Sequence, residues 1–233
     1  MRSGKYLAGA AVLLAAFIGL AVYGQAANDM GAGVTAAQAL QMLHDGNARF
    51  AAGKSLHPRL DAARMAETAA HGQRPIAAIL GCSDSRAPVE AIFDQGIGDL
   101  FVVRVAGNVA AADQLGSLEY AVGHLGAPLI VVLGHTACGA VTAAATDAQE
   151  PPNVAQLLGR IKPAVRQAAA QHPLASGSEL IPLAIESNVR QAIADILTGS
   201  PILRQSVDGG KITIVGAIYD IADGHVKWLG NQP

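Results

Sequence analysis

Short apolar runs without polar interruption recur along the chain and predict buried strands. Ile76–Leu80, Leu100–Val105 and Leu129–Leu133 show no alternation of apolar and polar positions. Such runs are typical of parallel strands that are covered on both faces. Ile212–Tyr219 is a fourth run of the same kind. We therefore expect a mainly parallel central sheet.

A turn signal follows the last of these runs. Asp223-Gly224 separates Ile212–Tyr219 from the shorter segment His225–Leu229. Asp-Gly between two strand-like segments is typical of a hairpin. We expect His225–Leu229 to form an edge strand that pairs antiparallel with its predecessor.

Apolar residues at helical spacing predict helices between the strands. Asp113–Leu125 lies between the second and third predicted strands, which predicts a parallel unit with a right-handed crossover. The other predicted helices are Thr35–Gly53, with Thr35 as N-cap, Asp61–Ala70, Val154–Gln171 and Glu179–Leu197. No linker-like composition divides the chain. We expect one α/β domain over residues 28–233, with helices flanking the sheet.

Residues 1–27 differ from the rest and predict a secretory signal peptide. Arg2 and Lys5 precede the apolar run Leu7–Val22, and small residues follow up to Ala27. The run is shorter than the roughly 20 residues that span a bilayer. We expect cleavage after Ala26 or Ala27 and a periplasmic or otherwise exported protein. The alternative is an uncleaved N-terminal anchor, the one case in which we expect membrane contact.

The overall composition excludes a disordered chain and argues against a nucleic-acid partner. Of 233 residues, 51% are apolar and 15% are charged, which excludes a disordered chain. The formal net charge is −2, and basic residues form no block. A nucleic acid is therefore not an expected partner.

The two cysteines of the chain each follow a predicted strand. The first strand leads into Cys82, and the third leads into His135 and Cys138. Because the carboxyl ends of parallel strands meet at one edge of a sheet, where ligands gather, these side chains are expected to lie close together.

Three explanations fit this arrangement. The cysteines could form a disulfide in an exported protein, or they could be buried, inert thiols, although we do not expect positions just after strands to lie in the core. The third explanation is a metal site. Two thiolates and one imidazole favour zinc, and three protein ligands leave a fourth position open, as in catalytic zinc sites.

Two segments together resemble the signature of the β-class carbonic anhydrases. They are Cys82-Ser83-Asp84-Ser85-Arg86 and His135-Thr136-Ala137-Cys138-Gly139. The resemblance extends over about Val34 to Leu229. It includes the segments Phe93–Gly96, Asp99–Arg104, Ala106–Asn108, Ser117–Ala121 and Glu186–Val189.

The resemblance implies a lyase that reversibly hydrates CO₂ to bicarbonate and a proton. It implies that Cys82, His135 and Cys138 bind one Zn²⁺ per chain, and that a zinc-bound hydroxide attacks CO₂. Asp84 would orient the hydroxide, and Arg86 would hold the Asp84 carboxylate. Asp84 would become a fourth zinc ligand only in a closed form.

The resemblance also implies substrate-binding residues and an oligomer. Gln73, Gly107 and Gly139 match positions that border the substrate pocket. We expect a homodimer or a dimer of dimers, in which the N-terminal helix packs on a second subunit. Two alternatives stay open, namely a hydrolase of CS₂ or carbonyl sulfide with the same fold, and a non-catalytic zinc- or bicarbonate-binding protein with a degraded Asp-Arg pair.

Overall fold

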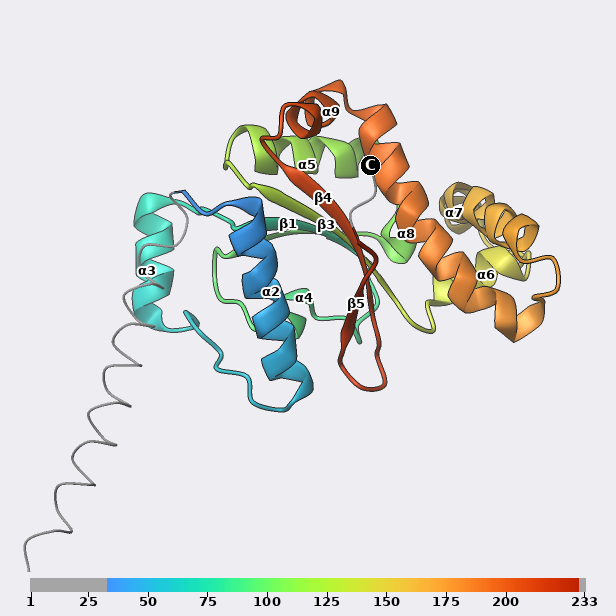
Figure 1. Ribbon diagram of the computed structural model, residues 1–233, viewed down its shortest axis with the longest axis horizontal. Helices are drawn as coiled ribbons and strands as arrows, with labels where there is room; N and C mark the ends of the chain where they lie inside the picture. The colour runs from blue at the N-terminus through green and yellow to red at the C-terminus, as the bar shows by residue number, and fades with distance from the viewer. Residues whose placement is uncertain (1–32, 231–233) are drawn as a thin grey trace, which may run out of the picture. The chain divides into compact units, whose positions relative to one another are not determined.

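A five-stranded sheet organises the computed structural model, which describes residues 33–230 (Figure 1). The strand order is β2-β1-β3-β4-β5. The first four strands are parallel, and β5 pairs antiparallel with β4, as predicted. The strands are β1 (Ala77–Gly81), β2 (Leu100–Arg104), β3 (Leu129–His135), β4 (Thr213–Tyr219) and β5 (Val226–Trp228).

Five of the helices that the structure describes were predicted from apolar spacing. They are α2 (Ala36–Ala51), α3 (Ala62–His71), α5 (Ala112–Gly123), α7 (Pro152–Gln171) and α8 (Leu180–Gly199). Three further helices and two 3₁₀ turns were not predicted, namely α4 (Val89–Ile92), α6 (Gly139–Ala145), α9 (Pro201–Asp208), η1 (Ala106–Asn108) and η2 (Gly177–Glu179). These elements have at most eight residues, too few for a helical period to show in the sequence.

Local capping sets the start of the first two helices. Thr35 accepts a hydrogen bond from the Gln38 amide at 3.2 Å, and the Gln38 side chain accepts one from the Thr35 amide at 2.9 Å. This reciprocal pair satisfies two amides that the first turn leaves without partners. Asp61 caps α3 in the simpler way, through the Arg64 amide at 2.8 Å.

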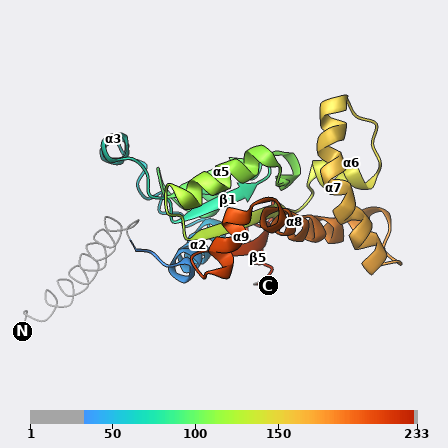
Figure 2. The same cartoon turned by 90° about the horizontal axis from the view of Figure 1, so that it is seen from above.

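Helices cover both faces of the sheet, as Figures 1 and 2 show. The helices α5, α8 and α9 pack on one face, where Leu118, Ile196 and Leu203 are fully buried, and α2 packs on the other. All residues of the central strands β1 and β3 are buried. This explains their unbroken apolar sequence.

A second apolar cluster lies beyond the carboxyl ends of the strands. The helices α6, α7 and α8 form it, and Cys82 and Cys138 belong to it together with Ile161 and Ile185. The cluster therefore covers the edge of the sheet at which we expected the metal site.

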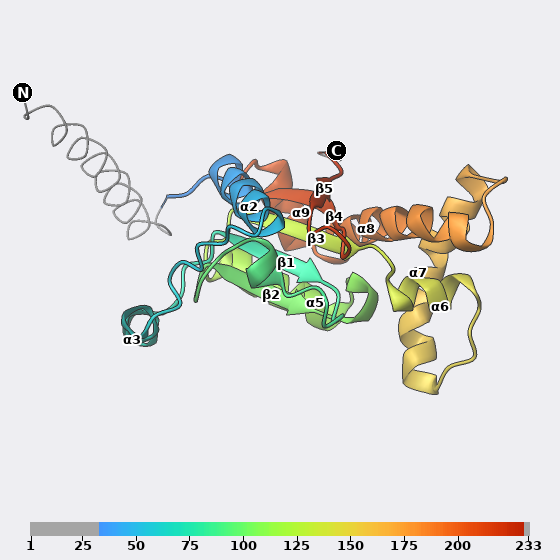
Figure 3. The same ribbon diagram turned by 90° about the horizontal axis from the view of Figure 1, so that it is seen from below.

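The helix α2, the first helix that the structure describes, packs on the sheet of its own chain, and its packing on a second subunit stays a prediction. Leu43 is fully buried against this chain. The Asn47 side chain donates to the Gly224 carbonyl at 2.8 Å and accepts from the Val226 amide at 2.9 Å. The apolar side of α2 is therefore used to cover its own sheet. In contrast, α3 has no buried residue and stands away from the sheet in Figures 2 and 3.

The predicted signal peptide lies outside the described residues. Within residues 33–230, no helix combines the length and the apolar content that crossing a bilayer requires.

Candidate metal centre

Cys82, His135 and Cys138 converge at the carboxyl edge of the sheet. Cys82 directly follows β1, and His135 is the last residue of β3, which pairs with β1. The three ligand atoms all lie within 4.8 Å of one another, and both cysteines are free thiols. The structure thus joins the three predicted ligands and shows no disulfide between the two cysteines.

Both cysteines are buried, which corrects our expectation that positions just after strands lie outside the core. Cys82 is 6% exposed and Cys138 is 1% exposed. The helices α6, α7 and α8 cover both cysteines. The sequence analysis did not predict α6. Burial alone would fit inert thiols, but packing does not explain why an imidazole nitrogen meets both sulfur atoms.

The His135 ring is oriented for a metal. Its Nδ1 lies 2.9 Å from the Thr136 carbonyl oxygen, which fixes the ring and leaves Nε2 facing the cysteines. Nε2 is buried and has no hydrogen-bond partner among the described residues. A buried nitrogen without a partner is costly, whereas coordination of a cation satisfies it. The residues therefore fit a metal ion.

The carboxyl end of β4 holds the loop that follows His135. The Thr136 amide donates to the Tyr219 carbonyl at 2.9 Å, and the Thr136 hydroxyl donates to Asp220 at 3.2 Å. Such second contacts keep ligand rings in place. Sequence analysis did not single out Asp220.

The environment of the two thiols favours one thiolate. A hydrogen bond from Cys138 lowers the pKa of the Cys82 thiol against the opposing effect of burial, and His135 and the Gly107 amide lower it further. The contact with Cys82, together with burial, raises the pKa of Cys138. Two thiolates this close repel one another, and a divalent cation between them neutralises their charge.

Asp84 and Arg86 form an ion pair beside the three ligands. The Arg86 Nε and Nη2 atoms donate to the two Asp84 oxygens at 2.9 and 2.7 Å, and the Arg86 amide donates at 2.9 Å. This contact holds the pKa of Asp84 well below its usual range. Asp84 Oδ2 lies 3.9 Å from His135 Nε2. An ionised carboxylate therefore borders the metal centre.

Arg104 anchors the loop that carries this pair. Standing at the end of β2, it donates through Nε to the Cys82 carbonyl at 2.9 Å and through Nη2 to the Asp84 carbonyl at 2.6 Å. Arg104 lies within a segment that carried the family resemblance, but its type and spacing gave no indication of this contact.

Gly107 lies against the sulfur of Cys82. Its amide donates to Cys82 Sγ at 3.2 Å, and its carbonyl accepts a hydrogen bond from Asn188 at 2.8 Å. Its φ of +69° is in the left-handed region, and a Cβ would lie 2.5 Å from Ile161 Cδ1. The turn thus requires glycine here.

Gly107→Ala is expected to destabilise the protein by about 2–5 kcal/mol, because a left-handed alanine costs about 1–2 kcal/mol and overpacking adds about 1–3 kcal/mol. Urea unfolding measures the change. Gly116→Ala in α5 is the matched control, since nothing lies within 4 Å of a Cβ there. We expect it to be neutral or slightly stabilising. Equal stability of the two variants would contradict the packing argument.

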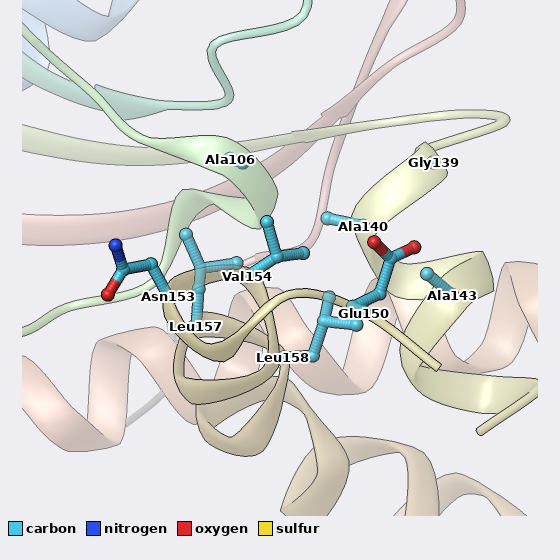
Figure 4. A pocket seen from close by; sticks show the side chains of 9 residues that line it. All are labelled: Ala106, Gly139, Ala140, Ala143, Glu150, Asn153, Val154, Leu157 and Leu158. Carbon is cyan, nitrogen blue, oxygen red and sulfur yellow. The ribbon is translucent and has the colours of Figure 1, made fainter. Parts of the chain in front are cut away.

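Gly139, the first residue of α6, lines an apolar pocket between α6 and α7 (Figure 4). The pocket has a volume of about 430 Å³. The other lining residues are Ala106, Ala140, Ala143, Glu150, Asn153, Val154, Leu157 and Leu158. Since Gly139 follows Cys138 and Ala106 precedes Gly107, the pocket adjoins the metal centre.

Gln73 is not brought to the metal centre of its own chain. It precedes β1 and lies beside Gly98, which precedes β2. These positions mark the amino edge of the parallel strands, whereas Cys82 follows the carboxyl end of β1. A role for Gln73 in substrate binding therefore needs a second chain.

Comparison with known proteins identifies the family. The carbonic anhydrase family profile matches residues 77–226, which include all three ligands and the Asp84–Arg86 pair. This chain belongs to the carbonic anhydrase family. The carbonic anhydrase of Mycolicibacterium smegmatis is 42% identical over 193 residues, covering 81% of this chain and 91% of the relative. Carbonic anhydrase 2 of Mycobacterium tuberculosis is 41% identical over 204 residues, covering 83% and 96%.

Solved structures place this carbonic anhydrase in the β class. A β-carbonic anhydrase of Sordaria macrospora, described as tetrameric, superposes with a TM-score of 0.66 at 27% identity. The match covers 80% of this chain and 94% of the fungal chain. The resemblance inferred from the sequence is thus confirmed, and the chain is a carbonate dehydratase that hydrates CO₂ to bicarbonate.

Proposed function

We propose that this carbonic anhydrase works with one zinc ion per chain, held by Cys82, His135 and Cys138. The convergence of two sulfur atoms and one imidazole nitrogen within 4.8 Å carries the proposal. This donor set favours zinc, and three protein ligands leave one tetrahedral position open for chemistry. When bound, zinc acts as a Lewis acid and ionises water near neutral pH.

Asp84 and Arg86 are proposed to orient the attacking oxygen. Asp84 Oδ2, at 3.9 Å from His135 Nε2, borders the centre and can accept a hydrogen bond from that oxygen, so that a lone pair faces the carbon of CO₂. Arg86 holds both Asp84 oxygens and keeps them ionised. While this contact persists, Asp84 is not free to become a fourth ligand. The pair therefore supports the open form.

Stopped-flow CO₂ hydration at about pH 8, with zinc assayed in the same sample, tests the proposal. We expect rapid hydration with about one zinc per chain. Zinc-loaded protein without hydration would contradict the proposed mechanism and would support the non-catalytic alternative, against which the intact Asp84–Arg86 pair argues. Carbonyl sulfide assayed in parallel tests the alternative hydrolase.

We propose further that the active unit is a homodimer or a dimer of dimers, in which Gln73 serves the partner's metal centre. Apolar side chains on α3 and the preceding loop have no cover in the chain, since Leu56, Leu60 and Met65 are 52–57% exposed. Gln73 follows the last residue of α3 by two positions. The exposed apolar residues of α3 and its preceding loop support the proposal that a second copy of the chain covers them.

The surfaces that would meet in such a dimer lie along the β2 edge of the sheet. The edge strand β2 has one unpaired side, and Tyr120 nearby is 48% exposed. Figure 3 shows α3 and α7 projecting beside β2 at opposite ends. A two-fold axis near β2 would place α3 of each chain against the pocket between α6 and α7 of its partner. The tetrameric relative from Sordaria macrospora fits such an assembly.

Co-expression of two inactive variants tests this arrangement. Gln73→Ala and Asp84→Asn are each expected to lower hydration when expressed alone. If Gln73 acts across the interface, a mixed dimer contains one site with both wild-type residues, and activity returns. If Gln73 acts within its own chain, no site of the mixed dimer is intact. Mixed dimers that stay as inactive as the separate variants would contradict the proposal.

We propose export to the periplasm on the composition of residues 1–27, which supports a cleaved signal peptide. Mass spectrometry of fractionated cells tests this. A chain beginning after Ala26 or Ala27 in the periplasmic fraction would support export. A full-length chain in the membrane fraction would support the anchor instead, and a full-length chain in the cytoplasm would contradict both.

A further inference from the structure

A buried polar side chain interrupts the apolar side of α8. Asn188 is 2% exposed and lies among buried residues of the same helix, including Ile185, Val189 and Ala192. Burying an amide is unfavourable unless it is hydrogen-bonded. An apolar residue would satisfy packing at this position, so the amide points to another role.

The amide of Asn188 contacts the turn that holds Cys82. Its Nδ2 donates to the Gly107 carbonyl at 2.8 Å, and the Gly107 amide donates to Cys82 Sγ at 3.2 Å. Two hydrogen bonds through one residue therefore connect α8 with a ligand sulfur. Asn188 does not contact the sulfur itself.

The turn needs such an anchor because its backbone is strained. Gly107 and Asn108 both have positive φ values, of 69° and 45°. Glycine adopts this conformation at no steric cost, whereas the left-handed Asn108 is strained and persists where the surroundings fix it. The Asn188 hydrogen bond is one such constraint, and it keeps the Gly107 amide directed at Cys82.

The helix α8 is itself firmly placed against the strand that carries His135. A Cβ at Gly134 would lie 2.7 Å from Val189 and 3.6 Å from Ile185. The same stretch of helix therefore packs on β3 beside one ligand and holds the turn beside another. The helix α8 therefore fixes the position of the turn beside Cys82 relative to His135.

We propose that Asn188 is a positioning residue of the metal centre, which acts through the Gly107 peptide on Cys82. This inference rests on the proposed metal centre. An amide that donates to a thiolate reduces the charge on the sulfur and fixes its direction. Loss of the Asn188 contact therefore weakens metal binding and changes the metal–sulfur bond, beyond any effect on folding.

Two variants of Asn188 remove the donor in different ways. Asn188→Leu introduces an apolar side chain of similar size without a donor, whereas Asn188→Asp keeps the shape, replaces the donating NH₂ by a carboxyl oxygen and, when ionised, adds a buried negative charge. The matched control is Ile193→Ala on the same helix, a core truncation that faces β4 near Gly216. The control separates loss of packing from loss of positioning.

Competition with a chelator gives the zinc affinity of each full-length protein, and the cobalt-substituted proteins give the sulfur-to-metal absorption band. Either Asn188 variant is expected to bind zinc about 10–100-fold more weakly. We also expect its band to shift. Ile193→Ala should lose stability and keep both the affinity and the band of the wild type.

Wild-type affinity and an unshifted band in a folded Asn188 variant would overturn the role of Asn188. The same would follow if Ile193→Ala weakened zinc binding as much as the Asn188 variants do. Wild-type protein that binds neither zinc nor cobalt would overturn the metal centre, and this proposal with it. The two failures are therefore distinguishable.

Discussion

His135→Ala is expected to abolish metal binding and to lower CO₂ hydration by at least about 10⁴-fold, since enzymes commonly accelerate reactions by about 10⁶-fold or more. The variant removes the one nitrogen ligand of the site. Cys82 and Cys138 alone leave two buried sulfur atoms without a neutral third ligand. Two ligands do not complete the three-ligand set of a catalytic zinc site.

Metal analysis of the purified variant and stopped-flow hydration measure the two effects together. His172→Ala is a suitable control, because His172 is an exposed residue at the end of α7. We expect this control to keep both metal and activity. A His135→Ala protein that retains a full complement of zinc would refute the assignment of His135 as a ligand.

Asp84→Asn is expected to reduce the hydration rate by about 10²–10³-fold while the zinc content is unchanged, a loss of the size seen when one polar contact to a transition state is removed. The amide has nearly the shape of the carboxylate but lacks its charge, so the contact with Arg86 weakens. One of its two atoms also becomes a donor. It then no longer accepts reliably from the attacking oxygen.

The retained metal is the informative part of this result. Asp84 lies beside the ligands without being one of the three, so its loss should affect the rate and leave metal binding intact. Asp113→Asn, an exposed carboxylate in the first turn of α5, is the matched control and should behave as wild type. An Asp84→Asn protein that loses its zinc would show instead that Asp84 helps to bind the metal.

Much of the fold could be predicted from local patterns. The unbroken apolar runs identified the four parallel strands because central strands are covered on both faces. Asp223-Gly224 correctly predicted the antiparallel edge strand. The helices α4 and α6 were missed because they are too short to show a period, and with α6 we missed the burial of both cysteines.

The sequence alone predicted the candidate ligands and their place after two strands, because that pattern depends on neighbours a few residues apart, and it predicted the Asp84–Arg86 pair through the family resemblance. The tertiary structure decided what distant segments contribute. Asn188 meets Gly107 only because α8 packs over the sheet edge, and no local spacing encodes that contact. Its signals in the sequence were a polar residue on an apolar helix side and its place in the segment Glu186–Val189, which carried the family resemblance. Gln73 shows the same limit, because strand direction places it at the opposite edge from Cys82.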